Sequence, residues 1–276
     1  ITDGSHYVSV TTGTGNDFIS TIGAIETTIV AGDGRNTIVA DDSGLVDITT
    51  GSGNDSITVR DADTISIVAG NGNNTIVTST AIDLSALNTV SITTGTGNDI
   101  ISAVRADKAT IVAGDGTNNV TVSALEIDVT TGVGNDTVTI SGINTTFDEG
   151  DEGEDGLPST GGTGSGGDNE GNDDNAGVNP HFSDNNAPGS LLTLALGSGN
   201  NTLILGREVD LNNNGTPDVE YGVTALEGSV ITGTGIRLFV DNHSDLTNAN
   251  ITGATITSVV LKQELRITAD QFDQIG

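Results

Sequence analysis

The chain has 276 residues, with 38 acids against 8 Lys and Arg, so its formal net charge is −30. It contains no Cys, Met or Trp, which excludes disulfides, thiolate metal sites and cysteine nucleophiles. So acidic a chain repels nucleic acid and suits hard divalent cations that prefer oxygen ligands, and no apolar run is long enough to span a membrane as a helix.

A Gly-x-Gly turn recurs along the chain, with strand-like residues on both sides of it. From Gly13 to Gly233 the first glycines of these turns are spaced by 19, 19, 19, 25, 19, 18, 65 and 36 residues. We interpret this as a 19-residue unit with three insertions, near residues 79–88, over a long segment before residue 191, and around residues 210–221.

The residues around each turn alternate in polarity. An aliphatic residue lies three positions before the turn, and another apolar residue lies six positions after its first glycine, with Thr and Ser between them. The two sets are Val10, Ile29, Ile48, Ile67, Ile92, Ile111, Val129, Leu194 and Val230, and Ile19, Ile38, Ile57, Ile76, Ile101, Val120, Val138, Leu203 and Phe239. Alternation with period two, rich in Val, Ile and Thr, predicts strands with one buried face.

Nineteen residues cannot bury such a face alone, but stacked copies of the unit can. The sequence therefore predicts an all-β fold, a parallel β-solenoid of the β-roll or β-helix type with its Gly-x-Gly turns stacked along one edge. The alternative is a β-sandwich of short hairpins, which the fixed spacing of the turns disfavours. We expect the opposite half-turns to be irregular and to hold no ions.

The expected organisation has three parts. Residues 1–141 form solenoid repeats, residues 142–190 form an acidic, Gly-rich insert or loop, and residues 191–276 continue the solenoid to C-terminal strands. The insert has too few apolar residues to order itself as a core.

The turns alternate between Thr-Thr-Gly-x-Gly-Asn-Asp and Val-Ala-Gly-x-Gly-x-Asn. Because adjacent carboxylates would repel, Asn alternating with Asp halves the repulsion and still supplies a carbonyl ligand. We number turn positions from the first glycine of each Gly-x-Gly turn. Asp33 and Asp115 occupy the second position, and they supply a carboxylate in repeats whose fifth position is Asn. The sequence predicts several Ca²⁺ ions held in these turns; an Asn ladder without metal is the alternative. The predicted ligands at the fifth turn position are Asp17, Asn36, Asp55, Asn74, Asp99, Asn118, Asp136 and Asn201.

The best-preserved turns begin at Gly13, Gly51, Gly95 and Gly132. They resemble the calcium motif of repeats-in-toxin (RTX) proteins, Gly-Gly-x-Gly-x-Asp-x-aliphatic, over most of residues 1–141. The resemblance implies a secreted bacterial β-roll with Ca²⁺ between repeats. The chain departs from the family pattern because Thr or Ala replaces its first glycine and because the period is about 19 with a single Gly turn.

A second candidate calcium site lies in residues 210–218. Asp210, Asn212, Asn214 and Asp218 fit positions 1, 3, 5 and 9 of an EF-hand-like loop. Tyr221 stands where a bidentate Glu would be expected, and a plain Asn/Gly turn is the alternative.

No catalytic motif is present, and we expect no enzyme. The sequence predicts a calcium-binding, secreted structural protein, a subunit of a microbial surface filament, surface layer or matrix. Self-association into a head-to-tail filament or lattice is expected from strand-like residues near both ends of the chain, and a cell-surface glycan is a possible partner. The alternatives are a repeat or adhesin module of a larger secreted protein, and a polysaccharide-active β-helix enzyme or its accessory module.

Overall fold

The computed structural model describes residues 7–80, 88–141, 189–209, 219–240, 244–251 and 254–261. Within them every regular element is a strand, and almost all strand pairs are parallel, so the protein is all-β. No helix in the described residues could cross a membrane. The strands are β1 (Tyr7–Thr11), β2 (Phe18–Val30), β3 (Thr37–Thr49), β4 (Ser56–Ala69), β5 (Thr75–Thr80), β6 (Thr89–Thr94), β7 (Ile100–Ala113), β8 (Asn119–Thr131), β9 (Thr137–Ile140), β10 (Leu191–Leu196), β11 (Thr202–Leu205), β12 (Arg207–Val209), β13 (Val219–Tyr221), β14 (Val230–Val240) and β15 (Ala254–Leu261).

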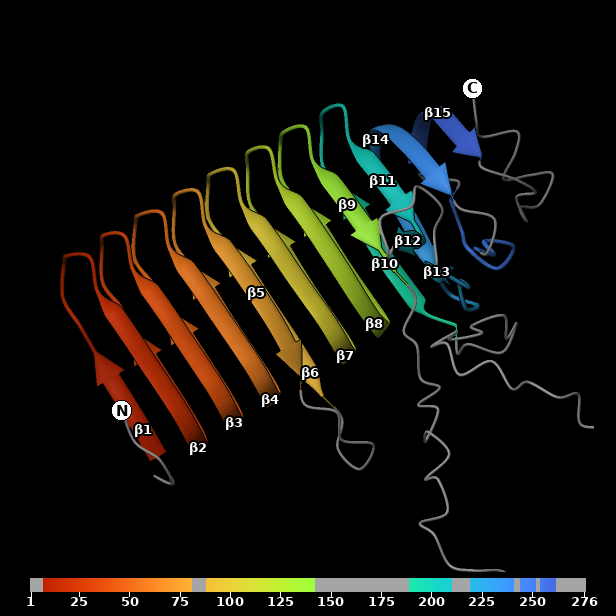
Figure 1. Cartoon of the computed structure of the whole chain (residues 1–276). Coiled ribbons are helices and arrows are strands. Elements are labelled where there is room, and N and C mark those ends of the chain that lie inside the picture. The colour runs from red at the N-terminus through yellow and green to blue at the C-terminus, as the bar shows by residue number, and fades with distance from the viewer. Residues whose placement is uncertain are drawn as a thin grey trace, which may run out of the picture.

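Successive strands lie side by side in parallel, each displaced by one repeat (Figure 1). Ile19 of β2 lies beside Ile38 of β3, and Ile38 lies beside Ile57 of β4, so the register equals the 19-residue spacing of the sequence. Because the hydrophobic pattern has period two, this register keeps every apolar column on the same face.

The long strands each contain two straight halves and a bend. Gly23, Asp42, Asp61 and Arg105 occupy equivalent places in this bend, and all four have positive φ, between 50° and 69°. The expectation that the opposite half-turns are irregular is therefore wrong for the backbone. The residue types differ from one bend to the next, but a residue with left-handed backbone angles recurs at the same place. The 18-residue spacing between Gly114 and Gly132 arises here as well, because β8 has one residue fewer in its bend.

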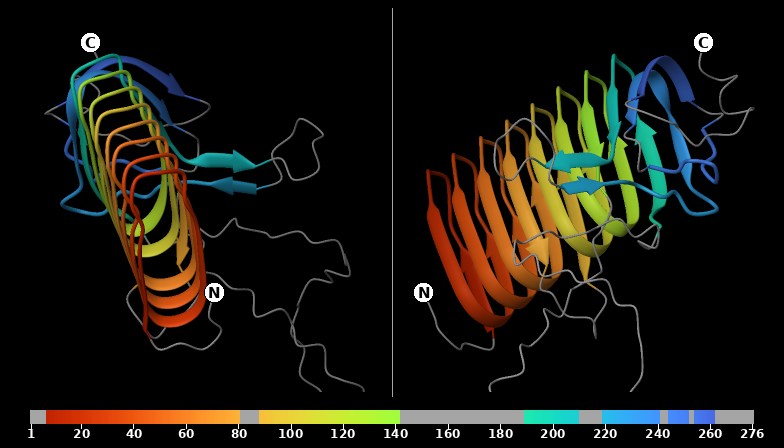
Figure 2. Two further views of the ribbon diagram at one scale, coloured as in Figure 1. Left: turned by 90° about the vertical axis from the view of Figure 1, so that its left-hand side faces the viewer. Right: turned by 45° about the vertical axis from the view of Figure 1, so that its right-hand side comes forward.

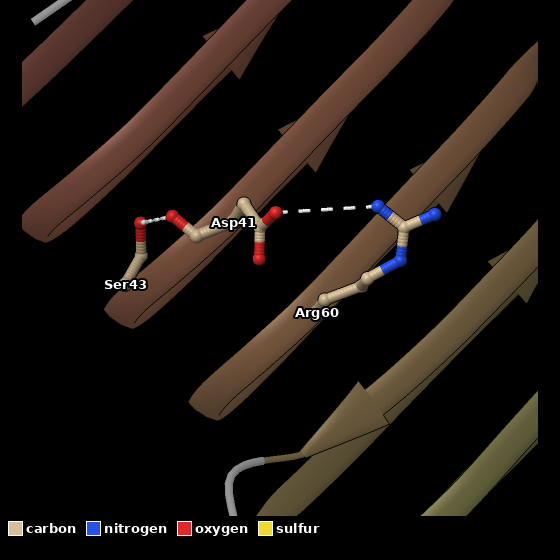
Figure 3. A network of polar contacts seen from close by, with 3 residues as sticks. All are labelled: Asp41, Ser43 and Arg60. Atoms are coloured by element: carbon tan, nitrogen blue, oxygen red, sulfur yellow. Dashed lines mark hydrogen bonds and ion pairs between the residues drawn. The ribbon is translucent and has the colours of Figure 1, made fainter.

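Charged side chains pair across neighbouring repeats beside this bend. Arg60 lies 4.0 Å from Asp41, and the hydroxyl of Ser43 donates a hydrogen bond to the Asp41 carbonyl at 3.5 Å (Figure 3). Lys108 and Glu126 form a second pair. Both pairs are largely exposed and contribute little to stability.

The predicted insertions near residues 79–88 and before residue 191 fall within the bends. β5 and β6 lie on the two halves of β4, and β9 and β10 lie on the two halves of β8. Each insertion therefore interrupts one repeat at its bend and leaves the register on both sides unchanged. The long segment 142–188 lies outside the described residues, and Ser190, at its predicted end, is already buried in the stack.

Five strands form a closed ring of parallel pairings, β8–β9–β11–β14–β10. The ring closes because β8 and β14 are continuous and each pairs with two shorter strands. β12 and β13 leave the stack as an antiparallel hairpin that projects sideways (Figure 2).

The interior consists of apolar columns in which like residues stack on like. Most members of the two predicted sets are fully buried, including Ile48, Ile67, Ile92 and Ile111 in one column. Val10, in the first repeat, is only partly buried and packs against this core.

The register assigned to the last predicted turn is wrong by one residue. Gly233 lies beside Leu196 rather than Gly197, so Ile231 and Leu238 are buried where Val230 and Phe239 were expected. The turn between them is two residues shorter than the others, and β14 runs through it without interruption. Parallel pairing then continues from β14 to β15.

Candidate functional site

The Gly-x-Gly turns form a row of thin loops along one edge of the stack (Figure 1). Each turn bonds to the next through its backbone: the N–H of the second glycine donates to the carbonyl at the second turn position of the following repeat. These bonds measure 2.8 Å from Gly34 to Ser52 and 2.9 Å from Gly97 to Asp115. The backbones of adjacent turns therefore run in close contact.

This close contact explains why the third turn position is always glycine. A Cβ atom added to Gly34 would lie 1.8 Å from the carbonyl oxygen of Gly15, and one added to Gly97 would lie 2.0 Å from that of Gly72. Both glycines also have positive φ, which L side chains rarely adopt. Only glycine allows one turn to stack on another here.

The second and fourth turn positions face solvent. Asp33 and Asp115 each accept a hydrogen bond on Oδ1 from the backbone N–H of the next repeat, at 2.7 Å from Ser52 and from Val133. Asn54 accepts one from the Asn73 N–H at 2.8 Å. These side chains form an outer row that holds successive turns together.

The fifth turn position points inward, and it is buried in every described turn except the first, where Asp17 is partly buried. From Asn36 onward, each residue there accepts a hydrogen bond on Oδ1 from the backbone N–H of its counterpart one repeat earlier, over 2.8–3.2 Å. This inner row is continuous along the edge and consists of Asp17, Asn36, Asp55, Asn74, Asp99, Asn118, Asp136 and Asn201.

Every Asn member of the inner row donates its side-chain amide to the first glycine of its own turn, and Asn118 and Asn201 donate a second bond to Asp136 Oδ1 and to the Thr234 carbonyl. The Nδ2 of Asn74 donates to the carbonyls of Gly70 and Gly72, both at 3.1 Å, and the Nδ2 of Asn36 donates to Gly32 at 2.9 Å. Asn118 and Asn201 bond to their own first glycines in the same way, at 2.8 Å. In these repeats the amide links the side chain to the turn carbonyls.

The Asp members are not satisfied. The Oδ2 atoms of Asp17, Asp55, Asp99 and Asp136 are buried and have no hydrogen-bond partner, and Asp99 is 0% exposed. Burying an ionised carboxylate oxygen without a partner costs several kcal/mol. One carboxylate oxygen in every second repeat is therefore buried without the polar or charged partner that would offset the cost of burying it.

The structure brings together only some of the calcium ligands predicted from the sequence. Asp and Asn of the fifth position are brought together in the inner row, whereas Asp33 and Asp115 lie in the outer row, where no hydrogen bond joins them to it. Among the described residues no group of three or more His, Asp or Glu side chains is placed to hold a metal ion. Asp210, Asn212, Asn214 and Asp218 belong to the segment between β12 and β13, which lies outside the described residues.

Sequence reasoning missed a threonine. The residue before the first glycine is Thr in the Asp repeats and Ala or Leu in the Asn repeats, and its side chain points inward. The Oγ1 atoms of Thr12 and Thr50 are buried without a partner, like the carboxylate oxygens of the same repeats. The alternation of Thr with Ala was visible in the sequence and follows the alternation of Asp with Asn.

The chain matches no protein-family model, and comparisons with curated proteins and with solved structures found no match.

Proposed function

We propose that the protein is a calcium-binding β-solenoid that serves as an extracellular structural element, a subunit of a microbial surface filament, surface layer or matrix. The observation that carries the proposal is the row of buried, unpartnered carboxylate oxygens along the turn edge. A hard cation is the partner that such oxygens need, and backbone carbonyls and hydroxyls supply the neutral ligands that Ca²⁺ accepts.

Two further features support this proposal. The strands pair in parallel with a register of one repeat, as a solenoid would require, and the turns lie along one edge. The formal charge of −30 gives bound cations a general stabilising effect, because they lower the repulsion within the chain. The loop 210–218 remains a separate candidate calcium site within the same proposal.

The proposal is tested by chelation. We expect excess chelator to lower the melting temperature of the β signal in circular dichroism, because ions that bind only the folded state stabilise it. Readdition of Ca²⁺ should restore the melting temperature. Equal melting curves in chelator and in millimolar Ca²⁺, after dialysis long enough to remove trapped ions, would contradict calcium binding.

A second candidate function is a binding module of a larger exported protein, such as an adhesin. The first outward positions of β3, β4 and β5 carry Thr, Ser and Val, as at Thr37, Ser56, Thr58 and Thr75. This gives the acidic protein a narrow uncharged strip rich in hydroxyls, which ends at the Asp41–Arg60 ion pair. Retention on an array of cell-surface glycans, lost when charged residues replace Ser56 and Thr75, would favour this function.

A further inference from the structure

We propose that Ca²⁺ occupies the interior of every second turn only, in the four repeats whose inner-row residue is Asp, and that the Asn side-chain amide takes the ion's place in the repeats between them. This inference rests on the proposed calcium binding and specifies where the ions lie. It divides the inner row into four cation sites, at Asp17, Asp55, Asp99 and Asp136, and four metal-independent turns.

The first step is that Asp and Asn side chains adopt the same position in the inner row. Oδ1 of Asp55 accepts the Asn36 N–H at 2.8 Å, and Oδ1 of Asn74 accepts the Asp55 N–H at 3.1 Å. Because both groups are planar and are anchored by the same bond, the second atom on Cγ takes an equivalent place in the turns from Asn36 onward, and we extend this to Asp17 from its matching sequence. That atom is Nδ2 in the Asn repeats and Oδ2 in the Asp repeats.

The second step concerns what this atom meets. In the Asn74 repeat, Nδ2 lies 3.1 Å from the carbonyl oxygens of both turn glycines. In the Asp repeats the same place is taken by an oxygen, so three oxygens converge with no proton between them. The absence of any hydrogen-bond partner for these Oδ2 atoms agrees with this. Oxygens about 3 Å apart are spaced as neighbouring ligands on one Ca²⁺ ion, which binds oxygen at about 2.3–2.6 Å.

The third step is the threonine. Thr50 and Asp55 belong to the same turn, both are at least 95% buried, and Thr50 Oγ1 and Asp55 Oδ2 both have no partner. The following Asn repeat has Ala69 in place of the threonine. A hydroxyl is therefore present in all four Asp turns and absent from the Asn turns; in Thr94 and Thr131 its oxygen also accepts a backbone N–H of the next repeat, at 3.4 and 3.2 Å.

The ligand set predicts the strength of binding. Each site has one carboxylate, with neutral oxygens from Thr and the turn backbone. Calcium affinity falls as the number of charged ligands falls, so the dissociation constant should lie at about 10⁻⁴–10⁻³ M, as in extracellular calcium modules. Ions in every second repeat would be about 10 Å apart, which limits their mutual repulsion.

The test is a reciprocal pair of substitutions at neighbouring inner-row positions. Asp55→Asn should lower the number of bound Ca²⁺ ions by one, counted by equilibrium dialysis with ⁴⁵Ca²⁺ or by native mass spectrometry. It should also raise the melting temperature measured in chelator, because the new amide bonds to the carbonyls of Gly51 and Gly53. The matched control, Asn74→Asp, should lower the melting temperature in chelator and add one ion of weak affinity when Ala69→Thr is introduced with it.

The outcomes separate this inference from the proposed function. An unchanged ion count in Asp55→Asn, with calcium bound by the parent protein, would overturn the alternation and leave calcium binding intact elsewhere. A parent protein that binds no Ca²⁺ in millimolar concentration would contradict the proposed function itself. A melting temperature that rises with Na⁺ to the same degree as with Ca²⁺, at equal ionic strength, would overturn the assignment to calcium.

A variant with all four inner-row Asp residues replaced by Asn gives a second test. It should fold, and its turn edge should no longer respond to chelator in hydrogen exchange. If it fails to fold, the inner carboxylates are needed for something other than cation binding, and the equivalence of amide and ion is wrong.

Discussion

At single positions, the turn glycines are constrained by the neighbouring turn as well as by their own backbone angle. Gly97 has a φ of 150° and lies against the carbonyl of Gly72, whereas Gly15 has a φ of 145° with no atom within 4 Å of the position of a Cβ. The two glycines therefore have similar backbone conformations, and they differ in whether a Cβ atom would meet the neighbouring turn.

Replacing Gly97 with Ala should destabilise the protein by more than about 3 kcal/mol, because the Cβ meets a backbone oxygen and two turns must separate. Gly15→Ala should cost only about 1–3 kcal/mol, the strain of the positive φ. Denaturant unfolding of both variants measures the difference. Equal losses would show that stacking of the turns does not require the glycine.

Arg105 is the bulkiest residue in the left-handed place of the bends, with a φ of 66°. We expect Arg105→Gly to raise the free energy of unfolding by up to about 1 kcal/mol, since glycine adopts this conformation without strain. Arg60→Gly, at an extended strand position beside the bend, is the control and should lower stability. A loss of stability in Arg105→Gly would mean that the arginine side chain makes a contact more valuable than the strain it causes.

At the scale of strands, stability comes from columns of like residues that run through consecutive repeats. Ile92 lies between Ile67 and Ile111, and all three are at most 1% exposed. Val112, one residue after Ile111, points outward and is 40% exposed. Neighbouring residues of one strand therefore differ in their role: Ile111 packs in the buried column, whereas Val112 faces outward and does not belong to it.

Ile92→Ala should cost about 2–5 kcal/mol, because the cavity it leaves is enclosed by the repeats above and below. Val112→Ala should change stability by less than about 0.5 kcal/mol. Chemical denaturation provides both values. Hydrogen exchange of the Ile92 variant should show the largest loss of protection in β6 and in β4 and β7, which pair with it, because repeats interact mainly with their neighbours.

At the scale of the whole molecule, charge and shape act in opposite directions. The stack presents long, regular faces on which a second copy could lie, while a formal charge of −30 on each copy keeps copies apart. Cations bound along the turn edge would lower that repulsion. The proposed role in a filament, surface layer or matrix depends on this balance.

We expect self-association to increase with Ca²⁺ concentration. Light scattering and negative-stain electron microscopy across a calcium titration should show growing linear or sheet-like assemblies in the millimolar range. An equal ionic strength of NaCl should have a smaller effect, because Na⁺ screens charge without binding the turns. A monodisperse monomer throughout the titration would contradict self-association.

The 19-residue spacing and the period-two alternation were enough to predict parallel strands, their register and most of the buried columns, because a repeated sequence stacks best on copies of itself. The shift of one residue at Gly233 could not be predicted, since the shortened turn of β14 keeps the same Gly-x-Gly letters. The recurring left-handed bend was hidden because Gly, Asp and Arg all occupy it, and only backbone angles identify them as equivalent.

The sequence alone determined which residues alternate in the turns, and the tertiary structure decided which way they point. Asp33 and Asp55 are both acids of Gly-x-Gly turns in adjacent repeats, and the letters give no reason to separate them. In the folded chain one lies in the outer row and bonds to the next backbone, while the other lies in the inner row with an oxygen that has no partner. The physical reason is the path of the turn: glycine at the third position reverses the chain, so the second and fourth side chains face water and the fifth faces the interior.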